Sequence, residues 1–142
     1  MKTRIPILSA VYLLLRREDK ILLMKRANGW MNGYYSLPSG HLDGGETIVH
    51  AMLRETYEEI GINIDEKKIK VIFVMHRLAD KEYIDFFLTT ESWTGVPKIK
   101  EPDKCSELEW FSIYSLPSNI VPHVKQFLKD IGENKIFSES ND

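Results

Sequence analysis

The sequence contains a single cysteine, Cys105, among 142 residues. One thiol cannot form an internal disulfide, and it offers no thiolate cluster for zinc. This usage fits a reducing compartment, so we expect a cytoplasmic protein. The formal net charge is only −2, so an excess of either sign is also lacking. We therefore expect no duplex nucleic acid and no membrane as a partner, and a small-molecule ligand is favoured.

Long hydrophobic runs are lacking as well. The longest candidate is Ile5 to Leu15, which follows the basic residues Lys2 and Arg4. It is too short to span a bilayer, and the charged run Arg16 to Asp19 follows it without a small-residue cleavage site. We interpret the run as a buried strand rather than a signal peptide.

The pattern of apolar residues predicts one domain over residues 1–132, followed by a polar tail over 133–142 that frays. Alternating or continuous apolar segments between polar turns predict two hairpins and two short strands. These strands cover residues 7–16 with 21–25, 71–78 with 83–90, 35–37, and 108–111. Helices are predicted from Thr47 to Ile60, and around Val124 to Ile131 with Gly132 as the stop. We expect a mixed sheet with two helices packed against it, which is an α+β fold or a three-layer α/β/α sandwich.

The first helix carries three glutamates in the stretch RETYEEIG. A helical wheel places Glu55, Glu58 and Glu59 together on one side, at spacings where like charges repel. The core face predicted by the same wheel is a separate stripe, made of Val49, Leu53, Thr56, Tyr57 and Ile60. Such a cluster is either a solvated acidic face or a site for a hard divalent cation, which prefers oxygen ligands.

The residues around this helix decide between the two interpretations. The segment GHLDGGETIVHAMLRETYEEIGI resembles the Nudix box of the MutT-like Nudix hydrolases at every fixed position: Gly40, Glu46, Arg54, Glu55, Glu58, Glu59 and Gly61. Two positions depart from the common pattern. Thr56 replaces a bulky aliphatic residue, and Ser39 stands where many relatives have glycine. The strand pattern and the last helix also look like the family.

The resemblance implies roles for the box residues. Glu55, Glu58, Glu59 and the backbone carbonyl of Gly40 would bind Mg²⁺, with Mn²⁺ as a substitute. Arg54 and Glu46 look like a pair that braces the loop against the helix, and Gly61 ends the helix. The general base in relatives is a box glutamate or an acid on a later loop. The candidates here are Glu55 and, outside the box, Glu101, with Glu107 and Glu109 as competitors of Glu101.

Outside the box, the sequence offers candidates for substrate contacts. Arg26 and Arg77 are predicted to meet phosphates. Four aromatic residues are candidates for stacking on a base: Trp30, Tyr34, Tyr35 and Phe86. Among them, Tyr34 is placed with the two arginines in the predicted substrate site.

The activity implied is Mg²⁺-dependent hydrolysis of a nucleoside diphosphate linked to a group X. For a chain this short we expect a nucleoside triphosphate, cleaved to a monophosphate and pyrophosphate. ADP-ribose, dinucleoside polyphosphates, nucleotide sugars and capped RNA are alternatives, although no proline stands at the spacing that marks ADP-ribose enzymes. Two further alternatives are a non-catalytic nucleotide sensor and an isopentenyl diphosphate isomerase, which would need Cys105 in its pocket. We expect a monomer or a homodimer.

Overall fold

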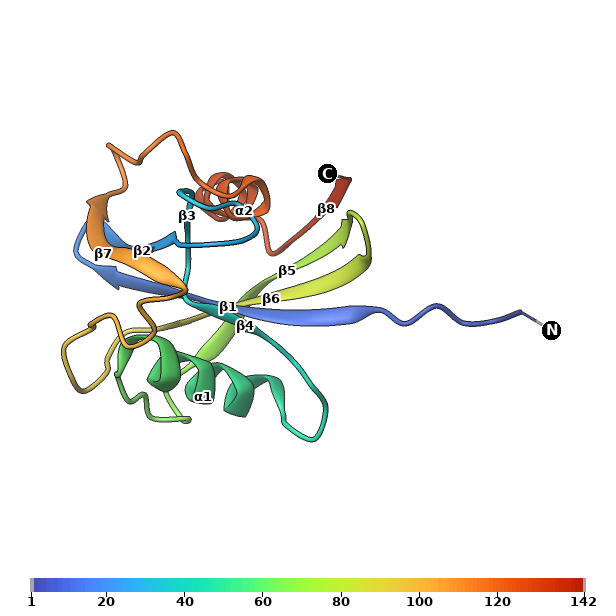
Figure 1. Ribbon diagram of the computed structural model, residues 1–142, viewed down its shortest axis with the longest axis horizontal. Coiled ribbons are helices and arrows are strands. Elements are labelled where there is room, and N and C mark those ends of the chain that lie inside the picture. The colour runs from blue at the N-terminus through green and yellow to red at the C-terminus, as the bar shows by residue number, and fades with distance from the viewer. Residues whose placement is uncertain (1, 142) are drawn as a thin grey trace.

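The computed structural model describes residues 2–141, so Met1 in the predicted domain and Asp142 in the predicted tail lie outside the described residues. The chain forms the strands and helices labelled in Figure 1. Their bounds are β1 Leu8–Arg17, β2 Lys20–Arg26, β3 Tyr35–Ser36, β4 Ser39–His41, α1 Ile48–Ile60, β5 Lys70–Leu78, β6 Glu82–Thr90, β7 Cys105–Ser112, α2 Pro122–Gly132 and β8 Phe137–Asn141.

Strand β1 is the centre of a mixed sheet. The strand order is β3-β2-β1-β6-β5-β8, with β4 on β1 and β7 on β2. Strands β1 and β6 run parallel along their whole paired length. Strands β1 and β2 pair only beside their turn, at Arg16 with Ile21 and Arg17 with Lys20. Beyond the turn the two strands are therefore free to diverge, which leaves room between them.

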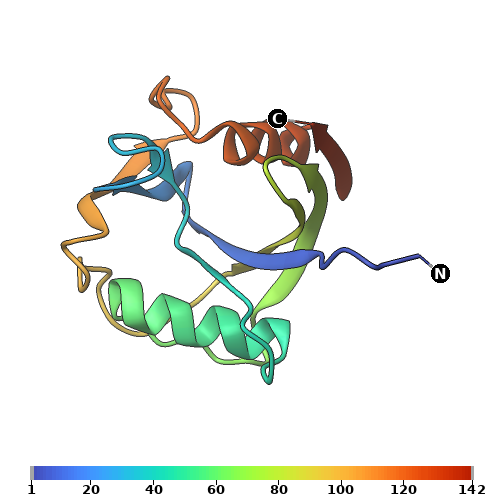
Figure 2. The ribbon, with the colours of Figure 1, turned by 45° about the vertical axis from the view of Figure 1, so that its right-hand side comes forward.

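The two helices lie on opposite sides of the sheet, as the two ribbon views show (Figures 1 and 2). Alternate residues of β1 point to opposite faces. Val11, Leu13 and Leu15 join the core under α1, whereas Tyr12 and Leu14 join the core under α2. The predicted α/β/α sandwich is confirmed.

Helix α1 begins and ends where its sequence predicts. The Thr47 side chain accepts a hydrogen bond from the backbone N–H of His50 at 3.2 Å, and Gly61 adopts a left-handed conformation with φ +72°. Thr56 is buried, and its hydroxyl donates to the Met52 carbonyl at 2.7 Å. The two capping residues thus determine where the helix begins and ends, and with that the positions of its glutamates.

The predicted core stripe of α1 was wrong at Tyr57. This side chain is 48% exposed, and Ala51 and Met52 are fully buried instead. The Lys100 ammonium lies 4.2 Å from the Tyr57 ring centroid. The ring thus packs against a cation from the β6–β7 loop, a contact between distant residues that no helical wheel includes.

The C-terminal tail was also predicted wrongly. Residues Phe137–Asn141 form β8, which pairs in parallel with β5. The Gln126 side chain donates to the Ser138 hydroxyl and to the Glu139 carbonyl, both at 3.1 Å. An edge strand is stabilised by backbone hydrogen bonds, so a polar sequence without an apolar face can form one.

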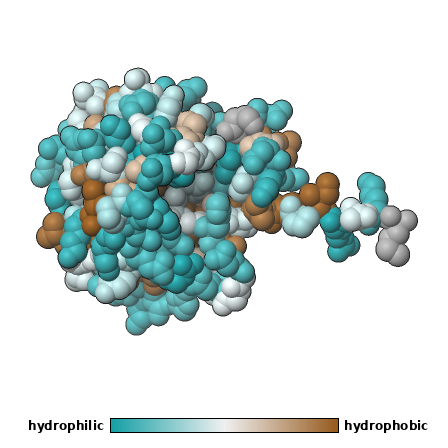
Figure 3. Space-filling view, viewed as in Figure 1, coloured by the Kyte–Doolittle hydropathy of each residue, from teal (hydrophilic) through white to brown (hydrophobic). Residues whose placement is uncertain are grey.

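At the other terminus, the predicted buried strand begins later than expected. Ile5 and Ile7 are 79% and 52% exposed, because strand pairing starts only at Leu8. Figure 3 shows this N-terminal segment standing away from the body of the molecule. Within residues 2–141, neither helix has the length and apolar character needed to cross a membrane.

Candidate active site

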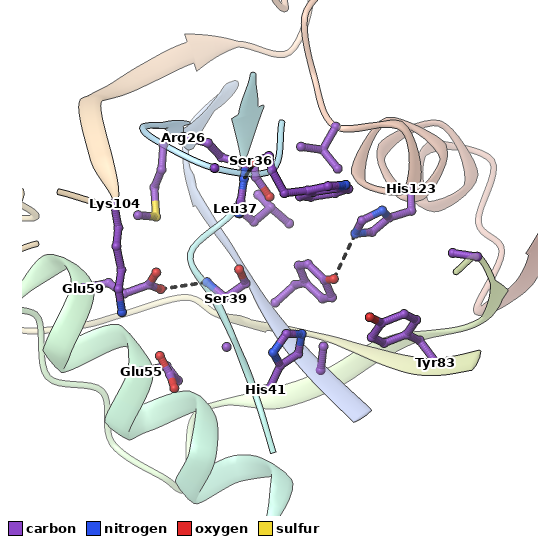
Figure 4. A pocket seen from close by; sticks show the side chains of 18 of the residues that line it. Arg26, Ser36, Leu37, Ser39, His41, Glu55, Glu59, Tyr83, Lys104 and His123 are labelled. Carbon is purple, nitrogen blue, oxygen red and sulfur yellow. Dashed lines mark hydrogen bonds between the residues drawn. The ribbon is translucent and has the colours of Figure 1, made fainter. Parts of the chain in front are cut away.

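A cleft of about 1130 Å³ opens over the sheet, where β1 and β2 diverge. It is lined by residues of β1 to β4, α1, the β5–β6 hairpin and α2, together with the loop that follows β2 and the end of the β6–β7 loop. Figure 4 shows Glu55 and Glu59 on one side of the cleft, and Tyr83 and His123 on the other. Segments far apart in the sequence therefore contribute to one hollow.

Two of the three glutamates on α1 line this cleft, Glu55 and Glu59. Glu59 accepts a hydrogen bond from the backbone N–H of Ser39 at 2.8 Å. At the position after Ser39, a Cβ atom on Gly40 would collide with the side chain of Glu55. Strand β4 therefore packs directly on the carboxylates, and this close approach explains why residue 40 has no side chain.

Arg54 and Glu46 form the predicted brace. Arg54 donates two parallel hydrogen bonds to Glu46, from Nε at 2.9 Å and from Nη2 at 2.8 Å. These hydrogen bonds lower the pKa of Glu46. The Nη1 group of Arg54 also donates to Glu55 at 2.9 Å and to Glu58 at 3.3 Å. One guanidinium thus joins the loop before α1 to two of the box carboxylates.

Burial changes the acidity of the carboxylates in the cleft. Desolvation raises the pKa of Glu59 to about 8, with smaller contributions from the negative charges of Glu55 and Glu101. Desolvation also raises the pKa of Glu55, although Arg54 opposes the shift. The cleft therefore disfavours bare negative charge at this end and would gain from a bound cation.

This pKa shift predicts how the stability of the metal-free protein depends on pH. Between pH 4.5 and about 8 the folded protein retains a proton on Glu59 that the unfolded chain loses. The stabilisation from this proton is full below pH 4.5, and it is lost as the pH rises through about 8. We expect urea unfolding in EDTA to show stability falling over this window. The Glu59→Gln variant should show a smaller fall in unfolding free energy over the same pH range. Equal slopes of unfolding free energy against pH for the two proteins would contradict the raised pKa of Glu59.

The oxygen donors of the cleft suit a hard divalent metal. Among residues 2–141, no three histidine, cysteine, aspartate or glutamate side chains form a ready-made metal cluster. Glu58 is half exposed and held by Arg54. Glu55 and Glu59 nevertheless present desolvated oxygens beside the backbone of Gly40, and oxygens are the ligands that Mg²⁺ and Mn²⁺ accept. The residues fit a hard cation, and the assignment of individual ligands stays a prediction.

Glu101 lies close to this cluster without lining the cleft. Its β6–β7 loop is tied to the end of α1, because the Lys100 backbone N–H donates to the Glu59 carbonyl at 3.1 Å. The Glu101 carboxylate lies 3.5 Å from Nζ of Lys104. Its charge contributes to the raised pKa of both Glu55 and Glu59. The structure therefore brings Glu101 near the box carboxylates, and its role as a base stays a prediction.

The predicted substrate residues divide into two groups. Arg26 and Trp30 line the cleft, whereas Tyr34 is exposed and lies outside its lining. Tyr35 is buried with its hydroxyl donating to Glu107, and Phe86 packs in the core under α1. Of the four aromatic candidates, only Trp30 contributes to the cleft surface.

Arg77 also lines the cleft, but its charge is already paired. Its Nε donates to Asp85 at 2.8 Å, and the Asp85 carboxylate is completely buried. Its guanidinium carbon lies 4.1 Å from the ring centroid of Tyr83. The geometry makes Arg77 part of a buried ion pair within the cleft wall rather than an exposed cation.

The cleft residues that sequence reasoning missed include four with side chains suited to contact a ligand: His41, Tyr83, Lys104 and His123. Lys104 projects beside Glu59 in Figure 4, and the charge of Glu101 raises its pKa. The Tyr12 hydroxyl lies 2.9 Å from Nε2 of His123. Strand alternation gives one usable signal, since Tyr83 shares a face with the buried Asp85. The other three lie where distant segments meet, and no local pattern marks them.

Comparisons with known proteins agree with this geometry. The family model of the NUDIX domain matches residues 6–131. An ADP-ribose pyrophosphatase from Methanocaldococcus jannaschii is 30% identical over 121 residues, which cover 82% of this chain and 68% of that protein. The crystal structure of a MutT NUDIX hydrolase from Burkholderia pseudomallei superposes with a TM-score of 0.81 at 24% identity, covering 87% of this chain and 97% of that one.

A third relative is a bifunctional NMN adenylyltransferase/ADP-ribose pyrophosphatase from Francisella tularensis, solved in complex with AMP and a manganese ion. It superposes with a TM-score of 0.67 at 26% identity, over 91% of this chain and 42% of that one. Divalent metals are general in this family of hydrolases. The chain belongs to the Nudix hydrolase family, and it is a Nudix pyrophosphohydrolase.

Proposed function

We propose that this chain hydrolyses a nucleoside diphosphate linked to X, with Mg²⁺ as cofactor, and that its substrates are nucleoside triphosphates. The products would be the nucleoside monophosphate and pyrophosphate. One observation carries the proposal above all. Two desolvated carboxylates from one helix, Glu55 and Glu59, line one side of a cleft whose opposite side is aromatic. This arrangement suits a metal–diphosphate group with a nucleoside attached.

Glu55, Glu58, Glu59 and the carbonyl of Gly40 would hold the metal. When bound, Mg²⁺ neutralises the diphosphate and lowers the pKa of a water molecule. Arg54 keeps Glu55 in position and is itself held by the two hydrogen bonds that it donates to Glu46. The Ser39 backbone N–H orients the Glu59 carboxylate toward the same place.

Hydrolysis requires a carboxylate that accepts the proton of the attacking water. The new oxygen–phosphorus bond forms as the anhydride bond breaks, and pyrophosphate leaves with the electron pair. Glu55 lines the cleft, and Glu101 lies on the loop tied to the end of α1, so these two are the proposed acceptors. Lys104, the last residue of this loop, lines the cleft and would add positive charge beside the phosphates.

The test is a turnover assay with Mg²⁺ on a panel of nucleotides. The panel contains nucleoside triphosphates, ADP-ribose, dinucleoside polyphosphates, nucleotide sugars and capped RNA. We expect monophosphate and pyrophosphate from triphosphates, and no turnover when EDTA replaces Mg²⁺. Tight nucleotide binding without turnover of any member would instead identify a sensor. The isomerase alternative is disfavoured because Cys105 is buried and does not line the cleft.

ADP-ribose is the second candidate substrate, and the archaeal relative named as an ADP-ribose pyrophosphatase supports it. A nucleoside on one side of the diphosphate and a ribose on the other would also use a cleft as large as this one. The products would be AMP and ribose 5-phosphate. Chromatography of the products, with kcat/KM compared for ADP-ribose and ATP, decides between the two substrates.

A further inference from the structure

Two aromatic rings line the cleft from opposite sides of β1, and each has an arginine against it. Trp30 follows β2, and Tyr83 lies on β6; these strands flank β1 in the sheet. The guanidinium carbon of Arg26 is 5.0 Å from the Trp30 ring centroid, and that of Arg77 is 4.1 Å from the Tyr83 ring centroid. The proposed hydrolytic step uses none of these four residues.

Hydrogen bonds hold each arginine in place against its ring. Arg26 donates from Nε to the backbone carbonyl of Trp30 at 2.9 Å, so it is anchored to the residue whose ring it covers. Arg77 and Tyr83 are directly paired across β5 and β6, and Asp85 binds the Arg77 guanidinium at 2.8 Å. A guanidinium over an aromatic face attracts the ring electrostatically and holds its orientation.

These rings belong to the end of the cleft that lies away from the carboxylates. Figure 4 shows Tyr83 and His123 across the cleft from Glu55, Glu59 and Lys104. The Trp30 ring lies 6.2 Å from the His123 ring, centroid to centroid, and is inclined to it by only 28°. One end of the cleft is thus charged and the other is aromatic.

We propose that the aromatic end is a nucleobase subsite, in which Trp30 and Tyr83 both contact the base, and that Arg26 and Arg77 are positioning residues for these rings rather than phosphate ligands. This inference rests on the proposed function, because it takes the substrate to be a nucleotide. Stacking tolerates any base, since every base has a π-face. The subsite therefore fits an enzyme that accepts several nucleotides.

The first test measures binding without turnover. AMP and GMP are titrated into the full chain in Mg²⁺, with inorganic pyrophosphate as the ligand that has no base. We expect Trp30→Ala and Tyr83→Ala each to weaken AMP and GMP binding by about tenfold, and to leave pyrophosphate binding within about twofold. Tyr114→Ala is the matched control, because Tyr114 is an exposed aromatic residue outside the cleft. Unchanged AMP affinity in either cleft variant would overturn the subsite.

The second test asks what Arg26 does. If Arg26 positions Trp30, Arg26→Met weakens AMP binding and raises KM with kcat retained, pyrophosphate binding stays unchanged, and Arg26→Lys restores part of the affinity. If Arg26 binds phosphate, AMP and pyrophosphate affinity fall together, which overturns its assignment as a positioning residue. Because binding is measured directly, the two proposals can fail separately. If the variants lose affinity for AMP but not for pyrophosphate, and the wild type hydrolyses no nucleotide, the proposed hydrolysis is refuted and the subsite is not. Turnover with unchanged AMP affinity would refute only the subsite.

Discussion

Glu59→Gln is expected to lower kcat by at least about 10²-fold with little change in folding. Glutamine has nearly the same shape and retains an oxygen that can accept the Ser39 N–H. It lacks the negative charge that a cation would neutralise in the cleft. Because burial already disfavours the carboxylate of Glu59, loss of its charge should not destabilise the metal-free protein. The loss of activity would therefore report on chemistry rather than on folding.

Steady-state kinetics with Mg²⁺ and circular dichroism of the same samples check this prediction. Glu66→Gln is the matched control, since Glu66 is an exposed glutamate whose ion-pair partner is the exposed His50, outside the cleft. Glu58→Gln should also reduce kcat if Glu58 leaves Arg54 to bind the metal. If the kcat of Glu59→Gln stays within about twofold of the wild-type value, the assignment of Glu59 to the active site is wrong.

Gly40→Ala is expected to impair both stability and turnover. The added methyl group would occupy the space of the Glu55 side chain, so either the Glu55 carboxylate turns away from its present position or β4 shifts. Overpacking of this kind costs about 1–3 kcal/mol of unfolding free energy. A displacement of catalytic groups by about 1 Å can lower the rate by about 10²-fold. Both effects arise from one steric contact between the strand and the helix.

Urea denaturation and kcat measurements on Gly40→Ala test this contact. Gly132→Ala is the control, because its methyl group would meet no atom within 4 Å beyond the backbone of its own helix and its chain neighbours. Adding Glu55→Ala to Gly40→Ala should recover stability, since it removes the colliding side chain, but it should not recover activity. If Gly40→Ala is as stable and active as the wild type, β4 does not press against Glu55 as described.

The local properties of helix α1 could be derived from the sequence alone. Thr47 caps it, Gly61 ends it, and the glutamate spacing places Glu55 and Glu59 one turn apart. These features depend on hydrogen bonds and periodicity within a few residues, so the residues themselves are sufficient to specify them. The same holds for the β5–β6 hairpin, whose apolar strands and polar turn are contiguous.

The polar tail and Tyr57 show where sequence reasoning failed. Strand β8 depends on the open edge of β5, and the exposure of Tyr57 depends on Lys100 in a distant loop. Neither partner is within reach of a local pattern. Composition alone predicts a solvated, frayed tail, and a helical wheel alone predicts a buried Tyr57.

The candidate site also combines features that could be predicted from the sequence with features that depend on the fold. Residue spacing was enough to predict which carboxylates gather on α1, and the resemblance to the family implied the pairing of Arg54 with Glu46. Three other features of the site required the folded chain. Trp30 and not Tyr34 reaches the cleft, Asp85 neutralises Arg77, and Lys104 joins the carboxylate end. Spacing along one element follows from backbone geometry, whereas the set of side chains that share a cleft follows from how strands distant in sequence pair around β1.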